Sequence, residues 1–182
     1  MTDTKEAGKD LVDAPRGLPL ATEETYLAAY EELAGREEGD QYLVFRLGEQ
    51  VYGLPLAQLS ELRHYEPPTP VPGTRDFVLG VVGVRGEVAT IVDLARRLGL
   101  PPVEPGPSAR IVMLKGDDLL GLLVSSVEGV VLVPPWDQEP PPPGLAASTA
   151  QQVTGIGRTP DGLRVALLDP VRLAEFEAIA DK

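Results

Sequence analysis

The second half of the chain repeats, in the same order, the pattern of its first half. Each half reads as strand, turn, strand, proline-rich loop, strand, turn, strand, aspartate and helix. Residues 53–56 have a counterpart 68 positions later at 121–124, and residues 88–94 have one 76 positions later at 164–170. Such self-similarity indicates two copies of one small β unit, and a copy of roughly 60 residues is marginal alone. We therefore expect a mainly β fold of two five-stranded β-barrels packed face to face.

Runs of strand-forming residues, bounded by turns, mark the individual strands. These runs are 42–47, 51–54, 77–84 and 88–92 in the first copy, and 110–114 and 119–124 in the second. Leu56, Leu59 and Leu62 recur every third residue, which favours a turn or short helix between the second and third runs. The two barrels are expected over residues 41–100 and 108–170.

Asp93 and Asp169 stand at matching places in the two copies, each directly before an expected helix. We expect Asp93 to cap a short helix over 94–98, and a last helix to follow Asp169 over 171–180. The matched positions favour two equivalent helix caps over a catalytic pair of carboxylates.

Residues 1–40 differ in character from the rest and carry 11 acidic and 4 basic residues. The first 20 residues lack periodicity and are predicted to be disordered. A helix is predicted over 23–34, because apolar residues recur on one face and Gly35 follows. Its apolar stripe consists of Tyr26, Leu27, Tyr30 and Leu33. Two interpretations stay open for this helix: it packs on its own domain, or it docks on another protein.

The composition excludes several chemistries. The chain has no cysteine and a single histidine, His64, so disulfides, thiolate metal sites, cysteine nucleophiles and histidine-rich metal sites are ruled out. No nucleophile and orienting carboxylate are evident near His64, and no phosphate-binding loop occurs. We therefore expect no enzyme activity, no catalytic residue, no cofactor and no metal. The net charge of −12 also disfavours nucleic-acid binding.

The N-terminus is polar, and no apolar run reaches the roughly 18 residues of a membrane helix. The chain is therefore expected to be cytoplasmic, without direct membrane insertion. A proline-rich run over 134–144 favours polyproline II, either as a stiff connector or as a ligand for an SH3 or WW domain. Trp136 within this run is expected to be tucked onto a barrel.

Arg85 is the residue that composition and pattern single out for binding. It follows an almost uncharged strand and stands beside Gly86 at the expected tip of a hairpin. A glycine lets the backbone of a partner approach, and arginine is favoured at the centres of interfaces. An exposed ion pair between Arg85 and Glu87, in the same turn, is the simpler expectation.

Several segments resemble the CheW family, the coupling proteins of bacterial chemotaxis. Residues 80–94 are similar to the signature Gly-Val-x-Asn-Leu-Arg-Gly, followed by a strand that ends in Asp-Leu, with Gly83 at the place of Asn and Thr90 at that of a proline. Residues 42–54 resemble the opening hairpin of the family, 59–62 its Val-x-Glu step, and 153–157 its closing glycine motif. The resemblance covers residues 41–182 in the right order.

The resemblance implies two SH3-like barrels and an adaptor without catalysis. Such an adaptor joins the regulatory domain of a CheA-type histidine kinase to the cytoplasmic tip of methyl-accepting chemotaxis receptors, in flagellar chemotaxis or in twitching motility. The alternative is an isolated regulatory β module that binds or sequesters the kinase without coupling it to a receptor. The resemblance also implies that the adaptor is recruited to membrane receptor arrays only through its partners.

The resemblance also implies functional positions. The residues that correspond to the coupling surface are Arg85, Gly86, Leu59, Glu61, Gly80 and Val84. The residues expected to line an apolar groove for a receptor helix are Leu54, Leu56 and Leu62. The residues expected to contact the kinase are Val124 and Val127.

Overall fold

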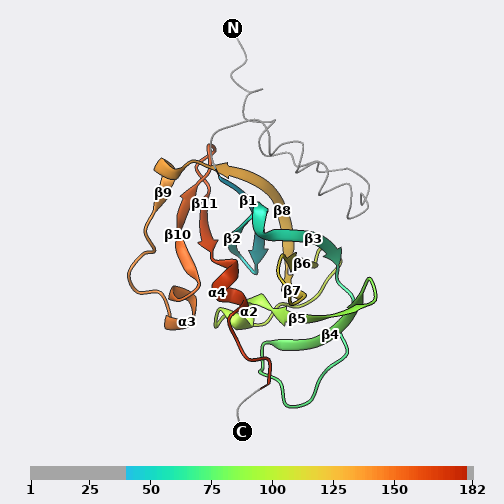
Figure 1. The fold of residues 1–182 in the computed structure, drawn as a ribbon. Coiled ribbons are helices and arrows are strands. Elements are labelled where there is room, and N and C mark those ends of the chain that lie inside the picture. The colour runs from blue at the N-terminus through green and yellow to red at the C-terminus, as the bar shows by residue number, and fades with distance from the viewer. Residues whose placement is uncertain (1–39, 180–182) are drawn as a thin grey trace.

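The structure is a computed structural model that describes residues 40–179 (Figure 1). The expected disordered tail, the helix over 23–34 and the last residues of the chain lie outside the described residues. The strands are β1 (Asp40–Leu47), β2 (Gln50–Pro55), β3 (Leu59–His64), β4 (Val78–Val84), β5 (Glu87–Asp93), β6 (Arg110–Leu114), β7 (Leu120–Val124), β8 (Ser126–Val133), β9 (Gln138–Glu139), β10 (Val153–Arg158) and β11 (Arg164–Leu168). The helices are η1 (Leu56–Gln58), α2 (Leu94–Arg97), η2 (Pro135–Asp137), α3 (Ala147–Ala150) and α4 (Pro170–Ala174). The expected mainly β class with short helices is confirmed.

The strands form two sheets that exchange their first hairpins. The six-stranded sheet has the order β8-β1-β2-β11-β10-β9, and the five-stranded sheet has the order β3-β6-β7-β5-β4. The hairpin β1–β2 thus lies among strands of the second copy, and β6–β7 lies among strands of the first. This corrects the expected division into barrels over 41–100 and 108–170, because each sheet draws on both halves of the chain.

Two glycines allow the exchanged hairpins to approach their neighbours. The exchange produces two parallel pairs, β2 with β11 and β7 with β5. A Cβ at Gly53 would lie 3.0 Å from Val165 Cγ1 of β11, and one at Gly121 would lie 2.8 Å from Ile91 Cδ1 of β5. The glycines that mark the repeat in the sequence are therefore equivalent contact points in the fold.

The expected turn or helix over 56–62 is wrong beyond residue 58, because β3 occupies residues 59–64. The register of β3 against β6 shifts between Leu59 and Glu61, so Ser60 is the extra residue of a β-bulge. The bulge brings Leu59 and Leu62 into the core although they stand three apart. In a bulged strand, buried residues can therefore stand three positions apart, which is also the spacing expected of a helical turn. Strand β8, at the equivalent place in the second copy, carries no such signal in the sequence.

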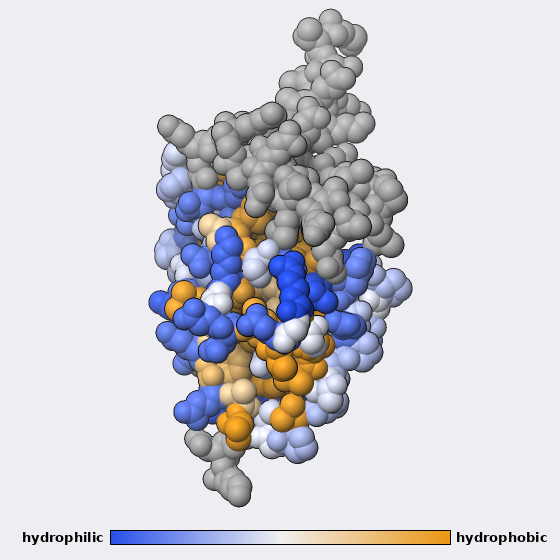
Figure 2. Space-filling model, turned by 45° about the vertical axis from the view of Figure 1, so that its right-hand side comes forward, coloured by the Kyte–Doolittle hydropathy of each residue, from blue (hydrophilic) through white to orange (hydrophobic). Residues whose placement is uncertain are grey.

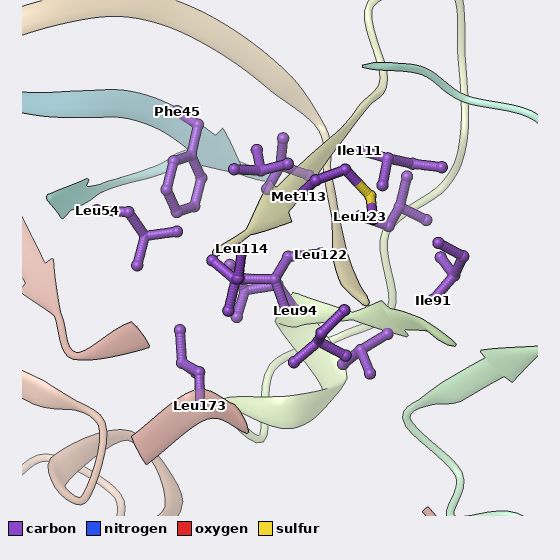
Figure 3. Close-up of a cluster of buried hydrophobic side chains, with 14 of the residues drawn as sticks. Phe45, Leu54, Ile91, Leu94, Ile111, Met113, Leu114, Leu122, Leu123 and Leu173 are labelled. Carbon is purple, nitrogen blue, oxygen red and sulfur yellow. The ribbon is translucent and has the colours of Figure 1, made fainter. Parts of the chain in front are cut away.

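The main core lies between the two sheets (Figure 3). Phe45 and Leu54 of the six-stranded sheet face Leu114 and Leu122 of the five-stranded sheet, and Leu173 of α4 approaches from below. Strand β1 is buried on both sides: Leu43, Phe45 and Leu47 enter this main core, while Tyr42 and Val44 enter a smaller core with residues of β8 and β11. This explains why β1 reads as a continuous apolar run.

The two aspartate caps are confirmed. Asp93 Oδ1 accepts a hydrogen bond from the Arg96 N–H of α2, and Asp169 Oδ1 accepts one from the Val171 N–H of α4. Helix α4 ends at Ala174, however, and not at residue 180. The chain beyond it leaves the helix and pairs with the loop before β4: Ala178 accepts a hydrogen bond from the Arg75 N–H, and Ile179 pairs with Thr74.

An aromatic contact holds this C-terminal segment. The ring of Phe176 packs edge-on against Phe77 at a centroid distance of 5.1 Å, and the guanidinium of Arg97 lies over both rings. Burial, with the nearby charge of Arg75, lowers the pKa of Arg97. The Arg97 side chain also donates to the carbonyls of Arg172 and Glu175, so it closes the end of α4.

Replacing Phe176 by alanine is expected to release the segment 175–179 while leaving the core intact. The lost edge-on pair is worth about 1 kcal/mol, and the ordering of the segment depends on it. Hydrogen exchange at the Arg75 amide, which donates to Ala178, should accelerate. Val171→Ala is the matched control, since Val171 is exposed on α4. Unchanged exchange at Arg75 in the Phe176 variant would contradict this account.

The expectation for Trp136 is wrong. Its side chain is 72% exposed on η2 and is the most exposed large apolar side chain of residues 40–179. Trp136 stands on the short turn η2 between β8 and β9, outside both strands. No helix within the described range is long and apolar enough to cross a membrane.

Candidate functional site

The hairpin between β4 and β5 presents Arg85 on a tight two-residue turn. Arg85 and Gly86 both have positive φ, at 51° and 85°. Two successive positive φ values define a type I′ turn, whose twist matches that of the flanking strands. Val84 before the turn is buried, so the strand is anchored in the core while Arg85 projects outward. The sequence-predicted hairpin tip is confirmed.

Arg85 pairs with Glu61 rather than with its neighbour Glu87. Arg85 Nη2 donates to Glu61 Oε2 at 2.8 Å, across 24 residues of sequence. Glu61 also accepts from Arg63 Nη1 at 3.4 Å, and Arg63 Nη2 donates to Glu66 at 3.4 Å. A chain of alternating charges therefore runs from the turn along β3. Nothing in the sequence pattern indicated the roles of Arg63 and Glu66.

This network joins the two outermost strands of the five-stranded sheet. Strands β3 and β4 are its outermost strands, and the Arg85–Glu61 pair connects the end of β4 to β3. The carboxylate of Glu61 is only 10% exposed, whereas the side chain of Arg85 is 75% exposed. A nearly buried carboxylate thus holds an exposed guanidinium in a defined direction.

Apolar surface adjoins the ion pair. Val88, three residues after Arg85 on β5, is 69% exposed. It lines a shallow hollow with Val81 and Gly83 of β4 and with Thr69 and Pro67 of the preceding loop. Hydrophobic and strongly hydrophilic surfaces lie side by side on the face shown in Figure 2. We call the surface of Arg85, Gly86, Val88, Glu61 and Arg63 the Arg85 face.

Gly80 supports the Arg85 face from behind and is not exposed on it. Its φ of 142° lies at a bulge of β4, and a Cβ there would lie 2.1 Å from the Thr69 carbonyl oxygen. The close approach lets Thr69 exchange two backbone hydrogen bonds with Val81. Gly80 therefore positions the loop that borders the hollow.

Several residues expected at contact surfaces lie in the core instead. Leu54 and Val124 are 0% exposed, and Leu59 and Leu62 are also buried. Leu54 and Val124 are sealed within the sheets, and Leu59 and Leu62 point into the core from the inner face of β3, so none of the four can line a groove or touch a kinase without unfolding of the sheets. Only Leu56 and Val127 of the expected groove and kinase residues are half-buried, and both pack against the core.

Within the described residues, no group of three or more His, Asp or Glu side chains is arranged to hold a metal ion. Burial raises the pKa of Asp93. The hydrogen bonds that its carboxylate accepts from the Arg96 and Val103 N–H groups act in the opposite direction, because they stabilise the charged form. Asp93 is thus occupied as a structural acceptor.

Two packed sheets that expose an ordered charged turn define a small two-sheet β domain. The chain belongs to the CheW-like domain family, which matches residues 41–178. It is 28% identical over 155 residues to the chemotaxis protein CheW of Klebsiella aerogenes, covering 85% of this chain and 93% of that protein. It is 33% identical over 132 residues to protein FrzA of Myxococcus xanthus, covering 71% and 82%.

A solved structure shares the fold. The crystal structure of scaffolding protein TtCheW from Thermoanaerobacter tengcongensis matches with a TM-score of 0.68 and 27% identity, over 77% of this chain and 95% of that chain. The expectation of two SH3-like subdomains is thereby confirmed, and so is the family resemblance.

Proposed function

We propose that this protein is a non-catalytic adaptor that couples methyl-accepting chemoreceptors to a CheA-type histidine kinase in a bacterial chemosensory array. Family membership supports the adaptor class, and the relatives include chemotaxis proteins. The observation that carries the assignment to one surface is Arg85, which is exposed but held by the nearly buried Glu61. The protein would act in the cytoplasm and reach the membrane only through its partners.

The Arg85 face has the properties of an interface centre. Arg85 offers a partner a charge that is held in one direction, and the exposed Val88 beside it offers apolar surface that a partner can cover. Interface centres commonly combine these two properties. The type I′ turn keeps this arrangement ordered before binding, which lowers the entropy cost of association. Coupling energies between sites are typically about 1–3 kcal/mol, so receptor and kinase can influence one another without a large motion of the adaptor.

Arg85→Ala is expected to abolish receptor-dependent control of the kinase and to leave the fold intact. Because the Arg85 side chain is 75% exposed, its pair with Glu61 contributes about 1 kcal/mol or less to stability. The melting temperature should fall by no more than about 2–4 °C. The measurement combines pull-down and kinase assays of the full chain with its cognate kinase and a receptor cytoplasmic fragment.

Arg46→Ala is the matched control for this experiment. Arg46 also pairs with a glutamate, Glu128, at 3.0 Å, but on the six-stranded sheet. The control variant should retain full kinase control. Kinase binding by the wild-type chain without any receptor effect would instead favour a module that sequesters the kinase. A large loss of melting temperature in the Arg85 variant would make Arg85 structural and refute the site.

A further inference from the structure

Trp136 lies where the N-terminal extension joins the folded part of the chain. Asp40 is the first described residue, and it pairs with Val133 at the end of β8. Val133 precedes Trp136 by three residues, a distance of at most about 11 Å along the chain. In Figure 1 the chain enters β1 at the same end of the molecule at which β8 ends and the β10–β11 hairpin turns.

Tyr42 also links the start of β1 to the segment that follows Trp136. Tyr42 of β1 interacts with the charge of Asp40 and is hydrogen-bonded to Gln138, two residues after Trp136. Gln138 pairs with Gly157 near the end of β10, so η2 and the β10–β11 turn share one end of the six-stranded sheet. Leu163 in that turn is 38% exposed. Of these two exposed apolar side chains, Trp136 is the larger and the more exposed.

The extension carries a matching apolar stripe at a matching distance. Tyr26, Leu27, Tyr30 and Leu33 recur at helical spacing, and only the six residues 34–39 separate this stripe from Asp40. Six residues span up to about 20 Å, which exceeds the reach needed from Asp40 to Trp136. A tether this short gives an effective concentration on the order of mM, so even a weak apolar contact is populated.

We propose that the apolar stripe of residues 26–33 docks intramolecularly on Trp136 at the end of the six-stranded sheet. This chooses between the two uses that the sequence leaves open for the extension: it covers its own domain and not a partner. The large indole contributes most of the apolar surface that the stripe covers. The proposal does not depend on the Arg85 face.

Trp136 is the single tryptophan of the chain, so its fluorescence reports this contact directly. In the full chain, we expect blue-shifted emission and weak quenching by acrylamide. The full-length double variant Leu27→Ser/Leu33→Ser should shift the emission to the red and raise the quenching constant by about threefold, because the indole regains its 72% exposure. Glu24→Gln/Glu31→Gln, which spares the stripe, is the control and should behave like the wild type.

The melting temperature of each variant is measured in parallel, so that loss of the fold is not mistaken for undocking. Wild-type emission and quenching that already match the double variant would overturn the proposal and leave the stripe for another protein. Emission that shifts to the blue as protein concentration rises would also overturn it, since a second copy would then cover Trp136.

Discussion

Asp93→Ala is expected to destabilise the protein by about 3 kcal/mol, because two backbone donors lose their acceptor in a buried place. Asp93 is 1% exposed, and its two oxygens accept from the N–H groups of Arg96 at 3.2 Å and Val103 at 3.0 Å. The carboxylate thus caps α2 and also fixes the loop that leads from the first copy to the second. The melting temperature should fall by about 6–12 °C in thermal unfolding followed by circular dichroism.

Asp169→Ala provides the matched control at the equivalent position of the second copy. Asp169 caps α4 through the Val171 N–H at 2.9 Å, but its side chain is 27% exposed and it holds no distant loop. Its replacement should cost about 1 kcal/mol, since water can satisfy the freed donors. Equal losses for the two variants would show that burial and the contact with Val103 contribute nothing.

Gly80→Ala is expected to have the second large effect, through the loop that borders the Arg85 face. The new Cβ would lie 2.1 Å from the Thr69 carbonyl oxygen, and a φ of 142° is unfavourable for any L side chain. Backbone has to move, because both colliding groups are main-chain or Cβ atoms. Strain and overpacking of this kind cost about 2–5 kcal/mol together.

The loss should be visible at the backbone pair that Gly80 permits. The amides of Thr69 and Val81, which donate to each other's carbonyls at 2.8 and 2.9 Å, should exchange much faster in the variant. Gly83→Ala on the same strand is the control, because a Cβ there meets nothing within 4 Å. A Gly80 variant as stable as the Gly83 variant would show that the loop can retreat without cost.

The candidate site was predictable in part. The turn at Arg85 and Gly86 followed from local signals, because a two-residue turn between apolar runs depends only on nearby residues. The partner of Arg85 did not, since Glu61 is distant in sequence and nearby Glu87 was the simpler choice. Burial explains the remaining errors: Leu54 and Val124 belong to strands covered on both sides, and an apolar residue in sequence looks the same in a groove as in a core.

Local periodicity, turn chemistry and capping by themselves determined the repeated unit, most of its strands and the two aspartate caps. Those features depend on residues a few positions apart, and the same signals occur in both copies of the repeat. Only the tertiary structure decided that the hairpins β1–β2 and β6–β7 change places between the sheets. The alternation of apolar and polar residues shows which face of a strand is buried, but it does not specify which strands become neighbours in a sheet. The exchange of hairpins depends on long-range contacts that no local pattern encodes, such as the close approach of Gly53 to Val165 and of Gly121 to Ile91.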